Sequence, residues 1–323
     1  MKYILIIFAV LVQVVAHSHA QESSDPSNFI HPGLLHSQAE LDFIKQRVLA
    51  KEEPWFSGWK MLLEADISDM DWQSKASTNV LRGAYNKPDI GASDLELDAA
   101  AVYSQAIQWV VTGDARHAQK SIDMLNNWSS TLKSIGEHDA KPLVGMTGVS
   151  MINGAEIIRH TSDLWREEDI AQFEKMLLDV HYEVIKDFFD WANGNWDASM
   201  IQTMLSIGVF VDNQEIFDRA TNYFLEGDGN GAILNYFNDF GQCQESGRDQ
   251  LYVQMGIGFL GAAWKQGVDL YGAYDNRLAR GFEYTAKYNL GYDVPFEPYT
   301  SIGGSYKHTE ISARGQGTLQ AHL

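Results

Sequence analysis

The chain has 323 residues, of which 45% are hydrophobic and 12% aromatic. This composition is typical of a large folded core and excludes a largely disordered chain. Its 24 Lys and Arg residues against 43 Asp and Glu residues give a formal charge of −19. That charge makes nucleic acid and an acidic membrane surface poor partners, and an anionic polymer would need a locally basic or hydrogen-bonding cleft.

The N-terminus predicts an export signal. MKYILIIFAVLVQVVAHSHA carries Lys2, an apolar run and small residues ending at Ala20, which is the pattern of a signal peptide cut near Ala20. The apolar run is too short to span a membrane, and no later segment is long enough. We therefore expect residues 1–20 to be a signal peptide, residues 21–323 to be one domain, and the protein to be secreted or periplasmic without membrane insertion.

Helical periodicity dominates the remainder. A capping box at residues 37–40 and Pro54 begin the first two expected helices. Residues 66–91 form a long irregular loop, which is interpreted either as a cleft wall or as a plain surface excursion. Later helices are expected at 97–111, 115–132, 149–160, 167–180, 182–191, 198–210, 215–225, 251–270 and 276–288, and no strand pattern stands out. Antiparallel helix pairs of this length predict an all-α fold, an α/α toroid around a central cleft.

A polar stretch, FGQCQESGRDQLYVQM at residues 240–255, interrupts this pattern. So polar a run is a poor core, and it predicts a loop ending near Gly247 followed by a helix that is polar for two turns. With helical spacing, four side chains share one face: Glu245, Arg248, Asp249 and Tyr252. A carboxylate, a guanidinium and a phenol on one face suit an anionic sugar. The alternative is a solvated first turn with an Asp–Arg cap pair.

A second candidate is the loop NGNWD at residues 193–197. Asn193 and Asn195 carry amides that can bond hydroxyls or a carboxylate, and Trp196 offers a face for a pyranose ring. The alternative is an Asn-Gly turn in which Asp197 caps the following helix.

Two further loops carry aromatic and basic residues. Tyr299, Tyr306 and His308 lie in and beside TSIGGSYKH, and Arg82 and Tyr85 lie in the loop at residues 66–91. A side chain in a glycine-bearing loop of this kind can reach into a cleft and contact a substrate. The alternative for each of these residues is that it only packs against the fold.

No metal or cofactor motif is present. The histidines after the signal segment are scattered, without the HExxH or Cys/His patterns of zinc sites. The run GDGNGA at residues 227–232 has too few acidic residues for a hand-type calcium loop. A P-loop, a dinucleotide fingerprint and a G-x-S-x-G elbow are also absent from the sequence. We expect no metal and no cofactor.

Several words of the sequence resemble the alginate-lyase superfamily of α/α-toroid polysaccharide lyases, most closely polysaccharide lyase family 38. They are GNWDASM, GNGAI, GQCQESGRDQ, WKQGVDLYG and GFEYTAKYNLGYDVPFEP, spread over about residues 30–300. The resemblance implies β-elimination in a polyuronate such as alginate or glucuronan. The uronate carboxylate is neutralised, a base removes the C5 proton, and an acid protonates the departing O4.

The resemblance also implies a set of catalytic residues: Asn195, Glu245, Arg248, Tyr252 and Tyr306. Asn195 would face the substrate carboxylate, Glu245 would position it, and Arg248 would balance charge. Tyr252 stands where the family pattern has a histidine. Tyr306 is the first choice for the proton-carrying tyrosine and Tyr299 the second, so Tyr306→Phe is expected to lose at least about two orders of magnitude in rate. Substrate contacts are expected from Arg82, Tyr85, Asn193, Trp196, Gln244, Gln250, Tyr299 and His308.

Two other functions remain open at this stage. One is a glycoside hydrolase on an α/α toroid, with Glu245 and Asp249 as acid and base; their spacing is short for the usual inverting separation of about 6.5–9.5 Å. The other is a non-catalytic carbohydrate-binding protein. The chain stops at ISARGQGTLQAHL, where such a toroid needs further helices to close, so we expect a truncated chain or an open ring. The sequence leaves the oligomeric state open.

Overall fold

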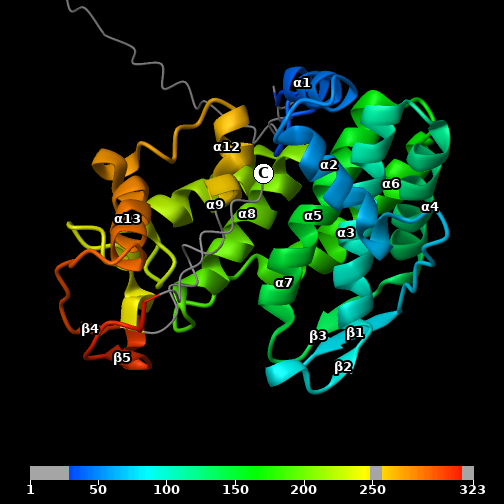
Figure 1. Ribbon diagram of the computed structural model, residues 1–323. Helices are drawn as coiled ribbons and strands as arrows, with labels where there is room; N and C mark the ends of the chain where they lie inside the picture. Colours follow the sequence, from blue (N-terminus) through cyan, green and yellow to red (C-terminus); the bar gives the residue numbers. More distant parts are fainter. Residues whose placement is uncertain (1–28, 248–256, 315–323) are drawn as a thin grey trace, which may run out of the picture.

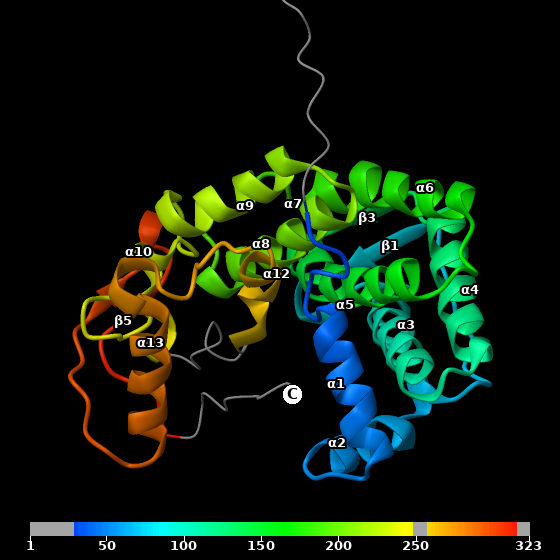
Figure 2. The ribbon, with the colours of Figure 1, turned by 90° about the horizontal axis from the view of Figure 1, so that it is seen from above.

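The computed structural model describes residues 29–247 and 257–314, and this part of the chain is mostly helical (Figure 1). Seen from above, α3 to α6 lie on one side, α7 to α9 run across the top of the view, and α10 and α13 lie on the other side (Figure 2). The described helices therefore follow an arc. None of them is both long and apolar enough to cross a membrane.

The earlier helices are α1 (Gln38–Leu49), α2 (Trp55–Glu64), α3 (Ala92–Thr112), α4 (Ala115–Thr131), α5 (Ala140–Thr161) and α6 (Glu167–Met176). The later helices are α7 (Glu183–Ile185), α8 (Gly194–Phe210), α9 (Gln214–Glu226), α10 (Ile233–Tyr236), α12 (Gly261–Lys265) and α13 (Ala273–Asn289). Short 3-10 or π turns are η1 (Asp66–Ser68), η2 (Ala84–Asn86), η3 (Leu177–Tyr182), η4 (Gln244–Gly247), η5 (Ile257–Leu260) and η6 (Ile302–Gly304).

The core is centred on α3, α5 and α8, which pack side by side, with α4 against α3 and α9 against α8. Every residue of α8 except Asn195 and Trp196 is buried, which explains why its sequence is apolar on all sides. By contrast, α4 and α9 are amphipathic and bury one face each. The predicted capping box also forms, because the Ser37 backbone donates to Glu40 Oε2 at 2.8 Å.

Two expected helices are wrong in part. Of residues 182–191, only α7 is α-helical, and it follows the π turn η3. Of residues 251–270, residues 251–256 lie outside the described part. The remainder forms η5 and α12, and the chain turns at Gly267 with φ +80°.

Two small sheets also contradict the expectation of no strands. The first has the order β2 (Asp89–Ile90), β1 (Asn79–Arg82), β3 (Ser134–Gly136), with β1 parallel to β3 and antiparallel to β2. The second pairs β4 (Tyr299–Thr300) with β5 (Lys307–His308) in antiparallel fashion. Strands this short carry too few residues for an alternating pattern to be visible in the sequence.

A buried aspartate anchors the segment that leads into β1. Asp98 in α3 is 1% exposed and accepts hydrogen bonds from Trp72 Nε1 at 2.8 Å, Ser74 Oγ at 2.7 Å and the Lys75 backbone at 3.0 Å. It also accepts from Trp128 Nε1 of α4 at 2.8 Å. One carboxylate therefore ties the segment at residues 72–75 to both helices.

We expect Asp98→Ala to lower the free energy of unfolding by about 3–5 kcal/mol, because each buried donor left without a partner costs about 1–3 kcal/mol. Urea denaturation measures this loss. Asp94→Ala, on the same helix but part-exposed and 3.8 Å from Lys75, is the control and should change stability by less than about 0.5 kcal/mol. Equal effects of the two substitutions would contradict the anchoring role.

Candidate functional site

The candidate site lies where four segments that are distant in sequence meet. These are the start of α8, the loop at residues 227–232, the turn η4, and the β4–β5 hairpin with the turn between its strands. Side-chain hydrogen bonds from one buried residue, Asn230, connect all four.

Asn230 is fully buried, and its amide faces two ways. Its Nδ2 donates to the Ala192 carbonyl at 2.8 Å, just before α8. Its Oδ1 accepts from Gln244 Nε2 at 2.8 Å and from the Ile302 backbone at 2.8 Å. Asn230 was not predicted as a site residue, although the sequence GNGAI that contains it is part of the family resemblance. That resemblance was the available signal.

The first turn of α8 presents the amide expected from the sequence. Asn193 is the N-cap residue and is 8% exposed. At Gly194 a Cβ would lie 2.2 Å from the Tyr236 ring, so only glycine allows this close approach. The side-chain oxygen of Asn195 is buried and makes no hydrogen bond to a described residue. Such an atom is unusual unless a ligand completes it.

The turn η4 is buried, contrary to the expectation that this polar stretch makes a poor core. Gln244 and Glu245 are 4% and 1% exposed. Glu245 accepts a hydrogen bond from the Tyr236 hydroxyl, and Gln244 also donates to the Asn235 carbonyl at 2.9 Å. Polar residues can be buried here because partners from another segment satisfy them.

Because Glu245 is buried, the alternative of a solvated first turn is wrong for the described part of this stretch. Arg248, Asp249, Gln250 and Tyr252 lie outside the described residues. The helical face that Arg248, Asp249 and Tyr252 are expected to share with Glu245 therefore stays a prediction, as does a substrate contact from Gln250.

The β4–β5 hairpin brings two of the expected side chains to η4. Tyr299 and His308 are paired across the strands, with nearly parallel rings 6.2 Å apart. The Tyr299 hydroxyl lies 3.4 Å from Asn230 Oδ1. A Cβ on Gly247 would lie 2.2 Å from the His308 Cβ, so the histidine sits directly on η4. His308 Nε2 is buried without a hydrogen bond to any residue that the structure describes.

The electrostatics of Tyr299 favour its protonated form. Burial raises the pKa of Tyr299, and the negative charge of Glu245 raises it further. A phenol with a raised pKa keeps its proton at neutral pH, so it is in the form that a general acid needs and not in the deprotonated form that a base needs.

Tyr306 lies in the same hairpin. Its backbone carbonyl accepts from the Ser301 backbone at 2.9 Å, and its N–H donates to Ser301 Oγ at 3.0 Å. Its side chain is half-buried, and the structure shows no hydrogen bond from its hydroxyl to a described residue. The backbone therefore places Tyr306 in the same hairpin as Tyr299 and His308.

Trp196 lies at the edge of the cluster. Its ring packs edge-on against His138, which lies in the turn between β3 and α5, with ring centroids 5.6 Å apart. The ring centroid of Phe189 is also 5.6 Å away. The indole is half-buried, so part of it is available for stacking on a sugar ring.

Arg82 and Tyr85 do not join the cluster. Their sheet and the β4–β5 hairpin lie on opposite sides of the molecule (Figures 1 and 2). The Arg82 guanidinium is paired with Glu96 at 3.0 Å and with Asn86 at 2.9 Å, whereas Tyr85 is 95% exposed. The loop at residues 66–91 is therefore partly ordered structure on the far side, and a substrate role for these two residues stays a prediction.

Asp197 holds the start of α8 in place and is not the helix cap considered in the sequence analysis. It lies within the helix, is fully buried, and accepts from the Tyr223 hydroxyl at 2.8 Å, the Gly231 backbone at 3.1 Å and the Phe189 backbone at 3.2 Å. Burial raises the pKa of Asp197 to about 7, although these hydrogen bonds oppose the shift.

We expect the stability of the protein to fall as pH rises from about 4 to about 7. In this window the folded protein keeps the Asp197 proton, whereas the unfolded chain, with the ordinary pKa of 3.8, has lost it. Asp197→Asn should remove a slope of roughly 1 kcal/mol per pH unit, as measured by urea denaturation at several pH values. Asp190 is exposed and accepts a hydrogen bond from the same Tyr223 hydroxyl, so the Asp190→Asn protein should keep the pH dependence of stability. If Asp190→Asn also removed it, the assignment to Asp197 would be refuted.

The comparisons with known proteins agree with this architecture. The model of the family described as alginate lyase matches residues 82–294, more than half of the chain. An alginate lyase from Bacteroides ovatus has 12% identity and a TM-score of 0.60, with 80% of this chain and 84% of that chain covered. Alginate lyase A1-III from Sphingomonas species A1 has 16% identity and a TM-score of 0.55, with 78% and 77% covered.

A variant of A1-III complexed with a tetrasaccharide has 15% identity and a TM-score of 0.56, with 80% of this chain and 79% of that chain covered. No curated protein matches the chain. The structural similarities confirm the predicted α/α toroid. On the evidence of the family model, the chain belongs to the alginate lyase family.

Proposed function

We propose that this alginate-lyase family member is exported and cleaves alginate or glucuronan by β-elimination, as its resemblance to polysaccharide lyase family 38 implies. The observation that carries the proposal is the four-segment cluster. It brings the segments that carry Asn195, Tyr299 and His308 together around the buried residues Asn230 and Glu245.

The start of α8 suits the uronate carboxylate. The first turn of a helix of 17 residues has backbone N–H groups without helical partners and a partial positive charge, both of which favour an anion. Asn195 adds a side-chain amide that can donate to a carboxylate oxygen. Neutralising the carboxylate makes the neighbouring C5 proton easier to remove.

Glu245 acts in this proposal through its neighbours. It is buried and bonded to Tyr236, whose ring packs against Gly194. It therefore positions the first turn of α8, in keeping with the role implied by the resemblance.

Two proton carriers complete the reaction. Tyr299, held protonated by burial and by Glu245, is the acid that protonates O4. The base is His308 or Tyr252, and the variants His308→Gln and Tyr252→Phe decide between them. Loss of the pH-dependent limb of the rate profile in one variant identifies the base.

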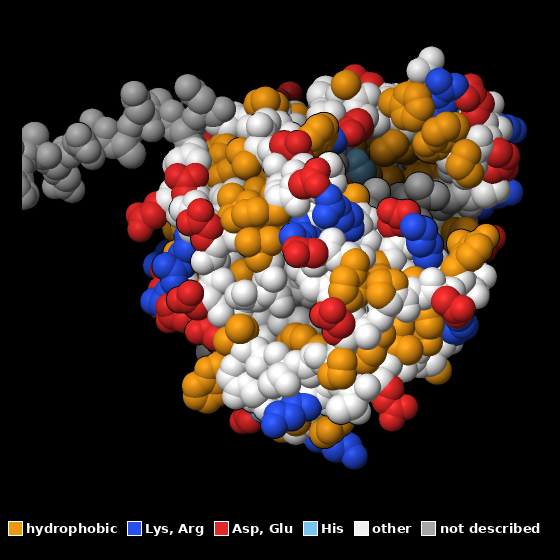
Figure 3. Space-filling view, turned by 90° about the vertical axis from the view of Figure 1, so that its left-hand side faces the viewer, with side chains coloured by type: hydrophobic (Ala, Val, Ile, Leu, Met, Phe, Trp, Pro, Cys, Tyr) orange, Lys and Arg blue, Asp and Glu red, His pale blue; other side chains and the backbone are white. Residues whose placement is uncertain are grey.

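The anionic substrate must approach a chain of formal charge −19. On the α13 side of the molecule, Lys and Arg side chains are interspersed with Asp and Glu, so this face is not uniformly acidic (Figure 3). At physiological salt, charges further away than a Debye length of about 8 Å are largely screened. Hydrogen bonds from the cluster to the substrate can therefore outweigh the repulsion between the anionic substrate and the net negative charge.

The proposed function is tested by incubating the mature protein with alginate and with glucuronan. An increase in ultraviolet absorbance from unsaturated uronate ends is expected with at least one polymer and should be lost in Asn195→Ala. New reducing ends without the chromophore would indicate the hydrolase alternative. Binding without either product would indicate a carbohydrate-binding protein. Either result from folded protein would refute the lyase proposal.

A further inference from the structure

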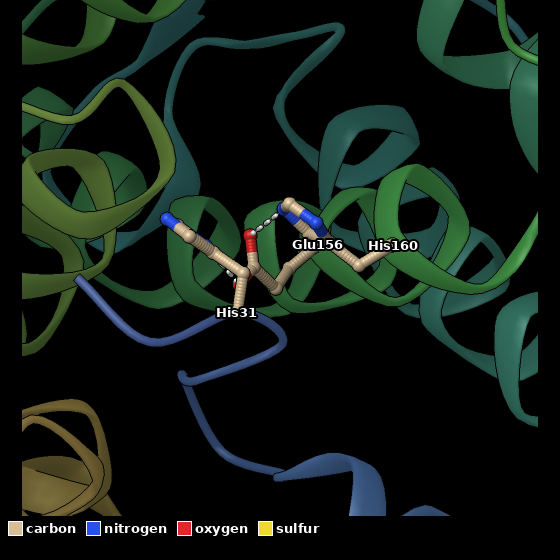
Figure 4. Close-up of side chains that lie close together, drawn as sticks. All are labelled: His31, Glu156 and His160. Atoms are coloured by element: carbon tan, nitrogen blue, oxygen red, sulfur yellow. Dashed lines mark hydrogen bonds and ion pairs between the residues drawn. The ribbon is translucent and has the colours of Figure 1, made fainter. Parts of the chain in front are cut away.

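A second cluster of polar side chains lies apart from the candidate site. His31 precedes α1, and Glu156 and His160 lie four residues apart in α5. The Glu156 carboxylate faces both imidazoles, which come from different segments (Figure 4). One nitrogen from each histidine and one carboxylate oxygen lie within 4.8 Å of one another.

Each side of the carboxylate faces one histidine. Glu156 Oε1 is 2.8 Å from His31 Nδ1 and also accepts from the Gly33 backbone at 3.1 Å. Glu156 Oε2 is 3.5 Å from His160 Nε2. Glu156 is buried, with 1% of its surface exposed. Glu156 Oε2 and His160 Nε2 are both buried without a hydrogen-bond partner in the described part of the chain.

This separation suits two ligands of one metal ion better than it suits a hydrogen bond. A hydrogen bond between nitrogen and oxygen is about 2.7–3.2 Å long. Two ligand atoms at about 2.0–2.2 Å from a tetrahedral zinc ion are about 3.4 Å apart. The 3.5 Å between Glu156 Oε2 and His160 Nε2 is close to that value.

The surroundings also match a metal site. The second ring nitrogen of His31, Nε2, lies 3.3 Å from Asp212 Oδ1, and histidine ligands commonly donate their other N–H to a carboxylate.

We propose that His31, Glu156 and His160 bind a divalent transition metal ion of the zinc type. Two histidines and one glutamate form a three-ligand set that leaves a fourth position for water. The histidine rings stack 4.5 Å apart in this structure, so binding requires them to turn toward the ion, with small shifts at His31.

The metal would fasten the segment before α1 onto the ring of helices. The Leu35 backbone donates to Asn153 of α5 at 2.8 Å. Gln266, just after α12, receives the Ile30 N–H at 2.8 Å and donates to the Gly33 carbonyl at 2.7 Å. This segment therefore bridges α5 and the α12 region, and a metal bond through His31 would strengthen the bridge.

The proposed metal site is structural and not catalytic. Glu156 lies 16 residues after Ala140, the first residue of α5, which corresponds to about 24 Å along the helix axis. The start of α5 is the end that adjoins His138 and Trp196. The proposal is therefore independent of the lyase function, and its readouts do not include activity.

The test uses the mature chain without an affinity tag, after chelator treatment. Titration with Co²⁺ should give visible absorption bands of a tetrahedral site at one equivalent. Zn²⁺ should displace the Co²⁺, and at a hundred-fold excess over Kd it should raise the Tm by at least about 3 °C.

Glu156→Gln and His160→Gln should each abolish the Co²⁺ bands, with folding confirmed by circular dichroism. His117→Gln is the matched control, since His117 is bonded to the Gln105 amide at 2.7 Å and should leave binding unchanged. If either cluster variant fails to fold, His31→Gln at the edge of the cluster gives the same test. Absence of binding by the native chain, or binding that survives the cluster substitutions, would overturn the proposal.

Discussion

Tyr299→Phe is expected to lower kcat on alginate or glucuronan by at least about a hundred-fold, the usual contribution of a general acid. The substitution removes only the hydroxyl, which lies 3.4 Å from Asn230 Oδ1. The phenyl ring keeps its stacked position beside His308. A loss in kcat with little change in KM would show that the hydroxyl acts in the transition state. Initial rates of ultraviolet absorbance give both constants.

Two variants serve as comparisons for Tyr299→Phe. Tyr103→Phe removes a hydroxyl that bonds His36 Nε2 at 2.5 Å, on α3 and outside the four segments of the site, and should change kcat less than about threefold. Tyr306→Phe tests the tyrosine that the sequence resemblance placed first. If Tyr306→Phe loses the activity while Tyr299→Phe retains more than about a tenth of it, the acid is Tyr306 and the assignment to Tyr299 is wrong.

Asn230→Ala is expected to lower the free energy of unfolding by about 3–5 kcal/mol and to abolish measurable activity. The substitution removes the Asn230 partner of the Ile302 N–H and of the Ala192 carbonyl, and it leaves Gln244 Nε2 with the Asn235 carbonyl alone. Each unpaired group costs about 1–3 kcal/mol. Activity is lost as well, because the start of α8, η4 and the hairpin no longer hold one another in register.

Urea denaturation and the ultraviolet assay together measure the effect of Asn230→Ala. Asn222→Ala, at an exposed position on α9, is the matched control and should leave the free energy of unfolding and the activity unchanged within error. If Asn230→Ala does not fold, Asn230→Asp retains the acceptor side and should show a smaller loss of the same kind. A stable, active Asn230→Ala protein would contradict the role of this residue as the connection between the four segments.

The helices were largely predictable because their packing is periodic. The repeats of apolar residues that indicated helices around 97–111 and 198–210 correspond to α3 and α8. Helix ends were less predictable, because they depend on remote partners. The chain after α7 leaves the helix, and the Phe189 N–H then donates to Asp197 of α8.

The candidate site was only partly predictable. Asn195, Glu245, Tyr299 and His308 were named from resemblance and residue type, and the structure brings their segments together. Asn230 was missed because a buried amide has no periodic signal and its partners lie 14 to 72 residues away. The turn η4 was expected to be exposed because its polarity, read locally, gives no sign of the partners that satisfy it.

The helical class, the order of the paired helices and the resemblance to a family of uronate lyases follow from the amino-acid sequence, since periodicity and short motifs are local properties. Which polar groups are buried and paired depends on how the chain folds. His31 and Glu156 are 125 residues apart yet lie 2.8 Å from each other, and no local pattern records that distance. Burial free energy and hydrogen bonding depend on neighbours in space, so the cluster around Asn230 and the proposed metal site become visible only when the chain is folded.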